Sequence, residues 1–337
     1  MKTLQEKILD SIMDRYAKKA DGVNALAEIL GVGIDPVYRR LRGDTLLMAD
    51  EIQLLVRKFN ISLDAMIYQD KDAILFSYNS FTQPVKTFEE YIQQFLENAR
   101  LTAKLPDVHV YYAAADFPIF YYTFFPELFM FKLYTWGKTV WNFEYLRNLP
   151  FAFDIISPHA MDMMKEVTNI YIGLENTELW NLNIVGNTLG QIEHHFNNGD
   201  FKNPEDALFL LQRLADLMLH VKKMAAEGQK LSLSGNKTHA APFHLYHNEM
   251  VITDNIIFMT SKAGKVLFST LSYPNFIRST DKQICEHQHE WFNMIIKKST
   301  PIDLEHAEDR EWFFSRVNTK IEMTRKRLEL RLLEMKG

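Results

Sequence analysis

The sequence predicts a mainly α-helical protein. Apolar residues recur every three or four positions through most of the 337-residue chain, which is the spacing of amphipathic helices. Five short segments of this kind fall within the first seventy residues, whereas most of the strand-like segments fall in the last third. We therefore expect an N-terminal domain of five helices, a central helical region, and a small C-terminal α+β module that ends in a long helix.

Residues 22–43, GVNALAEILGVGIDPVYRRLRG, predict two short helices joined by a tight glycine turn. Ala27 allows the two helices to cross closely, Gly31 turns the chain, and Val37 seats the second helix on the first. Apolar residues at helical spacing also predict helices over 3–17 before this pair and over 51–59 after it.

The second helix of the pair has start and stop signals. The Asp35 side chain can cap free backbone N–H groups, and Pro36 suits the first helical position. Gly43 then ends the helix. Three arginines lie between these signals, so we expect a short helix with a basic surface.

The segments LAEILGVGIDPVYRRLRG and LLVRKFNISLDAMI resemble the phage repressor/Cro-like (XRE-type) helix-turn-helix DNA-binding domain. The resemblance implies that the second helix of the pair enters the major groove of double-stranded DNA. The chain departs from the family at Val23, where glutamine is frequent, and at Arg40, where an apolar residue is usual. The residues expected to contact DNA are Asp35, Pro36, Tyr38, Arg39, Arg40 and Arg42.

The net charge of the chain does not indicate DNA binding. Only the local placement of the arginines on the second helix of the pair supports it. Residues 1–70 hold ten Lys and Arg against eleven Asp and Glu, and the whole chain has a net charge of −5. Non-specific DNA affinity comes mainly from neutralising phosphates, so a weakly binding domain needs a second copy and a second half-site. We therefore expect a homodimer. The alternative is a protein-interaction scaffold whose N-terminal helices do not bind DNA.

Composition shifts divide the chain into four parts. We expect the DNA-binding domain over 1–68, a linker over 69–86, a mainly helical sensory and dimerisation region over 87–228, and the α+β module over 229–337.

The central region contains an unusual aromatic segment. Residues 111–136 are rich in Phe, Tyr and Trp, which suits a buried core, a subunit interface, or a pocket for an unknown small-molecule effector. A strand is expected over 108–113 and a helix over 177–196.

The C-terminal module is expected to contain short strands at 243–246, 255–261 and 265–271, followed by a helix over 281–298. The last helix, 308–335, carries an apolar stripe. That stripe could pair two subunits or pack on its own chain.

No catalytic motif or cofactor-binding motif is found, so we expect no enzyme activity and no cofactor. Cys285 and His289 lie one helical turn apart, but no tetrahedral metal-ligand set is visible. A single cysteine, a charged N-terminus and no long apolar run favour a cytoplasmic protein that does not enter a membrane. These features together predict a homodimeric transcriptional regulator with a C-terminal sensing region.

Overall fold

The computed structural model describes residues 2–16, 18–59, 61–67, 74–78, 85–235, 240–249, 254–272 and 274–336. The chain divides into two compact units, unit 1 over Met1–Leu75 and unit 2 over Phe76–Gly337. Each unit has its own hydrophobic core. The boundary falls inside the expected linker, 69–86, most of which lies outside the described residues.

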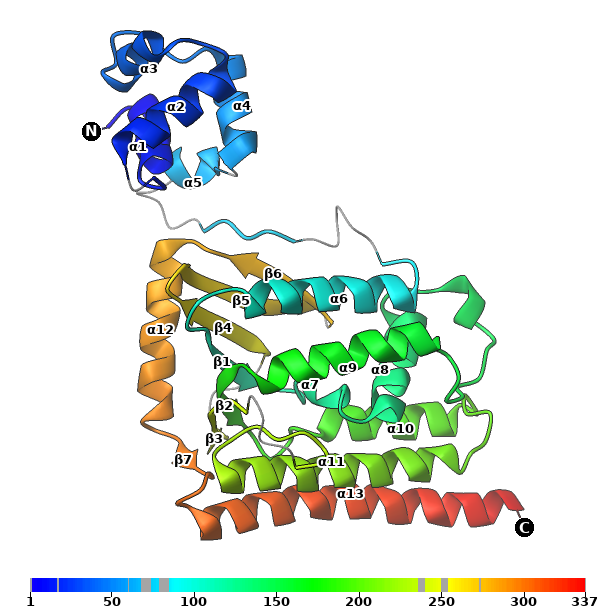
Figure 1. Cartoon of the computed structure of the whole chain (residues 1–337). Coiled ribbons are helices and arrows are strands. Elements are labelled where there is room, and N and C mark those ends of the chain that lie inside the picture. Colours follow the sequence, from blue (N-terminus) through cyan, green and yellow to red (C-terminus); the bar gives the residue numbers. More distant parts are fainter. Residues whose placement is uncertain are drawn as a thin grey trace. The chain divides into compact units, whose positions relative to one another are not determined.

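Unit 1 is a bundle of short helices (Figure 1). Its helices are α1 (Leu4–Met13), α2 (Lys19–Leu30), α3 (Ile34–Leu41), α4 (Ala49–Phe59) and α5 (Leu63–Ile67). Thr3 and Glu6 form a capping box that satisfies backbone N–H groups at the start of α1. The core that these helices share is made of Ile8, Leu9, Ile12, Val23, Leu26, Val37, Leu47, Leu55, Phe59 and Ile61.

Unit 2 is built on a mixed sheet. Within the described residues this sheet has seven strands in the order β6-β5-β4-β1-β2-β3-β7. Its three central strands are parallel: β1 (His109–Ala114), β2 (Glu175–Trp180) and β3 (Phe243–His247). The others pair antiparallel to their neighbours: β4 (Ile256–Ser261), β5 (Gly264–Ser272), β6 (Asn275–Ser279) and β7 (Thr300–Pro301).

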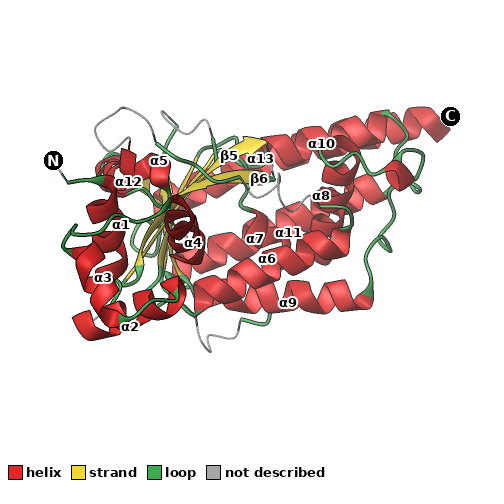
Figure 2. Ribbon diagram, turned by 90° about the horizontal axis from the view of Figure 1, so that it is seen from above, coloured by secondary structure: helices red, strands yellow, loops and turns green. Residues whose placement is uncertain are grey.

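Helices cover both faces of this sheet (Figures 1 and 2). On one face α12 (Lys282–Ile296) packs through Cys285, Phe292 and Ile295. The larger core lies on the opposite face. The elements of that layer are α6 (Phe88–Ala103), α7 (Ile119–Tyr122), α8 (Pro126–Thr139), the 3-10 helix η2 (Glu144–Leu146), α9 (Pro158–Ile172), α10 (Gly186–Asn197), α11 (Asp206–Glu227) and α13 (Ala307–Lys336).

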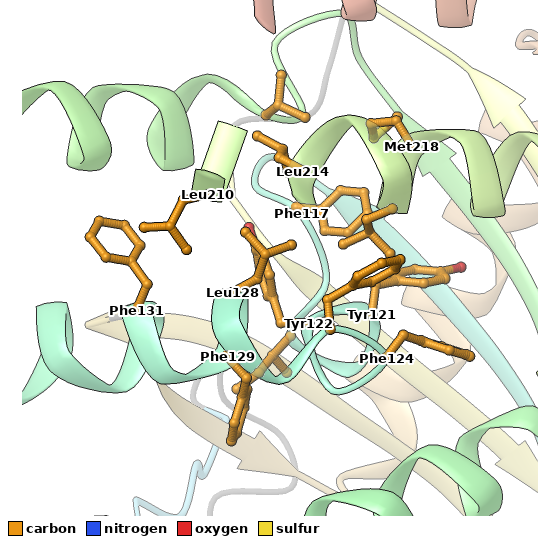
Figure 3. Packing of buried hydrophobic residues seen from close by; sticks show 14 of the residues in the cluster. Phe117, Tyr121, Tyr122, Phe124, Leu128, Phe129, Phe131, Leu210, Leu214 and Met218 are labelled. Atoms are coloured by element: carbon orange, nitrogen blue, oxygen red, sulfur yellow. The ribbon is translucent and has the colours of Figure 1, made fainter. Parts of the chain in front are cut away.

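The aromatic segment forms the centre of the larger core. Phe117, Tyr121 and Tyr122 are fully buried beneath α11, where they meet Leu214 and Met218 (Figure 3). Of the three expected roles for this segment, the structure supports the buried core of the same chain.

The prediction of a mainly α-helical protein is wrong. The region 177–196, expected to be one helix, contains β2 and then α10. Strand β2 lies inside the sheet between β1 and β3, and the sheet takes strands from both sides of residue 228. A glutamate beside Leu179 and Trp180 resembles the polar face of an amphipathic helix, and in the structure Glu178 is instead buried within the strand. None of the helices in the described part of the chain is long and apolar enough to cross a membrane.

Candidate nucleic-acid interface

The turn between α2 and α3 depends on Gly31. This residue ends α2 in the left-handed backbone conformation, with φ at 63°, which glycine adopts without strain. The N–H of Val32 reaches back to the Ala27 carbonyl at 3.1 Å and satisfies the end of α2. Val37 is buried in the shared core and seats α3 on the bundle. The predicted roles of Gly31 and Val37 are therefore seen in the structure.

Helix α3 begins earlier than its sequence signals suggest. Gly33 is the N-cap, and no side chain caps the helix. Asp35 and Pro36 occupy the second and third helical positions, because the helix already starts at Ile34. An acidic side chain in the first turn still interacts favourably with the helix dipole.

The outer surface of α3 combines apolar and basic side chains. Asp35 and Arg39 are exposed, Tyr38 and Pro36 are half-buried, and Ile34 is 50% exposed. Ile34 was not predicted as a contact, although it opens the helix. An exposed isoleucine at this position can contact the methyl group of thymine, which is an apolar mark in the major groove.

Arg42, just past α3, makes an exposed ion pair. Its Nε lies 2.8 Å from an Asp44 carboxylate oxygen, and both side chains are largely exposed to solvent. Exposed pairs of this kind contribute little to stability and are screened by salt. Arg42 can therefore exchange this partner for a phosphate.

Arg40 differs from the exposed Arg39 and Arg42 because its side chain lies mostly buried within unit 1. Its guanidinium donates to both Glu51 carboxylate oxygens, at 2.7 and 3.3 Å, and to the Pro36 carbonyl at 3.2 Å. The two side chains are 12% and 18% exposed. The ion pair ties α3 to α4, and it occupies the guanidinium that the sequence analysis expected to contact DNA.

Glu51 serves a second purpose at the start of α4. One of its oxygens accepts the Met48 N–H at 2.9 Å, just before the helix begins. Burial raises the pKa of the Glu51 carboxyl. The hydrogen bonds from Arg40 and Met48 lower this pKa by more than burial raises it, so the pKa lies below its ordinary value. The carboxylate is therefore ionised at neutral pH and holds both elements.

Gln5 is a positioning residue that the sequence did not indicate. Its amide nitrogen donates to the carbonyls of Arg40 and Thr45, at 2.8 and 2.9 Å, and its oxygen accepts the Leu47 N–H at 2.8 Å. All three partners lie at the end of α3 or in the loop that follows. A polar residue beside the apolar stripe of α1 gave no sign of burial in the sequence, and its partners lie thirty-five to forty-two residues away.

A second polar cluster lies inside unit 2, and it is closed to solvent. The carboxylate of Glu178 accepts hydrogen bonds from Tyr121, Tyr171, Asn176 and Trp180 at 2.6 to 2.9 Å. All five residues are buried. These four donors satisfy the buried carboxylate, so the cluster contributes to the stability of unit 2.

Lys230 is the basic member of this cluster. Its Nζ donates to the Tyr171 carbonyl at 2.8 Å and to the Asn176 side-chain oxygen at 2.7 Å, and it lies 3.4 Å from the centre of the Tyr171 ring. Burial lowers the pKa of Lys230 well below its ordinary value, while the charge of Glu178 raises it. The Asn176 side chain bridges the two ionisable groups.

The residues considered as metal ligands do not assemble. Among the residues that the structure describes, no three His, Cys, Asp or Glu side chains gather around one point. Cys285 is buried against the sheet, and burial raises the pKa of its thiol. His289 instead contacts Lys265, with 3.2 Å between Nδ1 and Nζ.

Comparison with known proteins adds no family to this description. No family model, no curated protein and no solved structure matches the chain.

Proposed function

We propose that this protein is a sequence-specific DNA-binding transcriptional regulator that acts as a homodimer and inserts α3 into the major groove. The observation that carries the proposal is the α2–Gly31–α3 arrangement. Val37 fixes one side of α3 to the bundle, and the other side leaves Ile34, Asp35 and Arg39 exposed. A short helix held in this way has the geometry of a recognition helix.

The exposed side chains divide by chemistry. Arg39 suits a guanine edge, where a bidentate contact discriminates by about 1–3 kcal/mol. Arg42 lies just past the helix and suits a phosphate, which would fix position without reading sequence. Arg40 is assigned to holding α3 against α4, because its bonds to Glu51 occupy the guanidinium.

Selection of the full-length protein on randomised duplex DNA, at low and near-physiological salt, tests the proposal. We expect enrichment of a two-fold-related motif that survives the higher salt. Arg39→Ala should then lose the preference at one base position in each half-site. Arg147→Ala is the matched control, since it removes an exposed arginine from unit 2.

The opposite result is equally clear. No enriched motif, together with no salt-dependent affinity for duplex DNA, would contradict the proposal and favour a protein-interaction scaffold. Equal affinity of the wild-type and Arg39→Ala proteins for the selected site would show that Arg39 does not contact the DNA and would contradict the insertion of α3 into the major groove.

A further inference from the structure

The exposed surface of α3 carries one acid among its basic side chains. Asp35 is the second residue of the helix and Arg39 lies four positions later, so the two side chains share one helical face. Both are exposed. Arg40 and Arg42 each pair with an acidic side chain. Within the described residues, Asp35 and Arg39 have no such partner, so both can meet a ligand at this surface.

A carboxylate at this position opposes binding to DNA as a polyanion. Affinity that is independent of sequence comes from basic side chains that neutralise phosphates, and a negative charge beside them lowers it. Residues 1–70 already hold ten Lys and Arg against eleven Asp and Glu. If α3 enters the major groove, Asp35 therefore needs hydrogen-bond donors there to offset this cost.

The major groove offers a carboxylate few donors. Guanine presents N7 and O6, and thymine presents O4, all of which are acceptors. Cytosine N4 and adenine N6 are the base amino groups that donate there. A carboxylate accepts hydrogen bonds and has none to donate. Cytosine and adenine are therefore the bases that Asp35 can bind.

We propose that Asp35 determines specificity by selecting a base with an exocyclic amino group, cytosine or adenine, beside the guanine contacted by Arg39. This role rests on the proposed function. Four residues of helix rise by about 6 Å, and stacked bases are about 3.4 Å apart, so the two contacts fall within about two base pairs. Asp35 lowers the overall affinity and raises discrimination, because it repels the acceptor edges of guanine and thymine.

Replacing the acid in the full-length protein is the first test. Asp35→Ala should bind non-specific duplex DNA about fivefold more tightly near physiological salt, because one negative charge is removed. At the selected site, its preference for the amino-bearing base should fall on the order of tenfold. Alanine is chosen because an asparagine amide can itself pair with adenine.

Asp50→Ala is the matched control. Asp50 is exposed and is the second residue of α4, as Asp35 is of α3, so both variants lose the same charge from the first turn of a helix. The control should keep the wild-type base preference. Thermal melts of both variants show whether either change affects folding.

Methylation of the exocyclic amino group is the second test, and it uses wild-type protein. In a base pair the remaining N–H of the methylated amino group bonds to the opposite base, so the methyl group replaces the donor that faces the groove. N4-methylcytosine or N6-methyladenine at the selected position should weaken wild-type binding on the order of tenfold. Asp35→Ala should respond far less, whereas Asp50→Ala should respond like the wild type.

The two proposals fail in different ways. If the wild-type protein selects no motif, DNA binding is contradicted and the role of Asp35 with it. If a motif is selected but Asp35→Ala keeps the same preference at every position, DNA binding stands and the role of Asp35 is overturned. Wild-type affinity that is unchanged by the methylated bases also overturns it, and this result does not depend on the folding of any variant.

Discussion

Arg40→Ala should destabilise unit 1, although the residue lies on the helix proposed to bind DNA. The substitution removes two hydrogen bonds to Glu51 and one to the Pro36 carbonyl, and it leaves a carboxylate that is 18% exposed without its cation. Exposed pairs contribute less than about 1 kcal/mol, whereas breaking a buried pair costs about 3–5 kcal/mol. For this intermediate burial we expect a loss of about 2 kcal/mol.

The distribution of tryptophan allows the loss to be localised. All five Trp residues lie in unit 2, so their fluorescence reports the unfolding of that unit, while far-ultraviolet circular dichroism reports both. Arg40→Ala should lower the melting temperature of unit 1 by ~10 °C and leave the tryptophan transition unchanged. Arg39→Ala should leave both transitions unchanged, because the side chain is exposed.

The pH dependence gives an internal check. The folded pKa of Glu51 lies below the value of 4.5 expected for the unfolded chain. Stability from the ion pair is therefore complete above pH 4.5 and is lost as pH falls through the lower folded pKa. The difference between wild type and Arg40→Ala should shrink in that acidic range. A constant difference across it, or an Arg40→Ala protein as stable as Arg39→Ala, would refute the structural role of Arg40.

Three further outcomes are expected. Gly31→Ala should lower the free energy of unfolding of unit 1 by about 1 kcal/mol. The loss comes from backbone strain alone, since a Cβ at this position meets no atom within 4 Å. Denaturant titration measures it, and an unchanged midpoint would contradict this expectation. Glu178→Ala should destabilise unit 2 by about 3 kcal/mol or more, because it leaves buried donors unsatisfied. Lys230→Met should cost less, because it leaves two buried acceptors, the Tyr171 carbonyl and the Asn176 side-chain oxygen, and not the four donors around Glu178. Tryptophan-detected unfolding of both variants compares them, and equal losses would argue against this account. Burial lowers the pKa of His195 more than its bond to Asp200 raises it, so unit 2 should lose stability as pH falls below 6.5. The loss should be smaller in His195→Gln. The same pH dependence of unfolding in both proteins would exclude this histidine as the cause.

Local structure was more predictable than the sheet. The α2–α3 turn follows from residues ten apart or fewer, since Gly31 and Val37 act within a few positions of each other. Strand β2 could not be predicted in the same way, because its partners β1 and β3 are more than sixty residues away in the chain. Its Glu178 fits a buried strand only when donors from α7 and α9 surround the carboxylate.

The candidate site shows the same division. Arg39 and Arg42 could be chosen from the sequence, because both lie in the short basic segment between Pro36 and Gly43. Separating Arg40 from Arg39 required the position of Glu51, eleven residues beyond Arg40. The contribution of Gln5 depends on partners thirty-five to forty-two residues away, which no helical spacing reveals.

The separate cores of the two units determine where the chain can be cut or recombined. Unit 1 buries its own apolar residues, so a break near Leu75 severs no shared core and would allow this unit to be joined to another protein. A break near residue 228 has the opposite effect, because it would remove β3, β4 and α13 from a sheet and core built jointly with β1 and β2. The chain is therefore modular at one point only within the described residues, and any fragment that keeps the second half must begin close to Phe76.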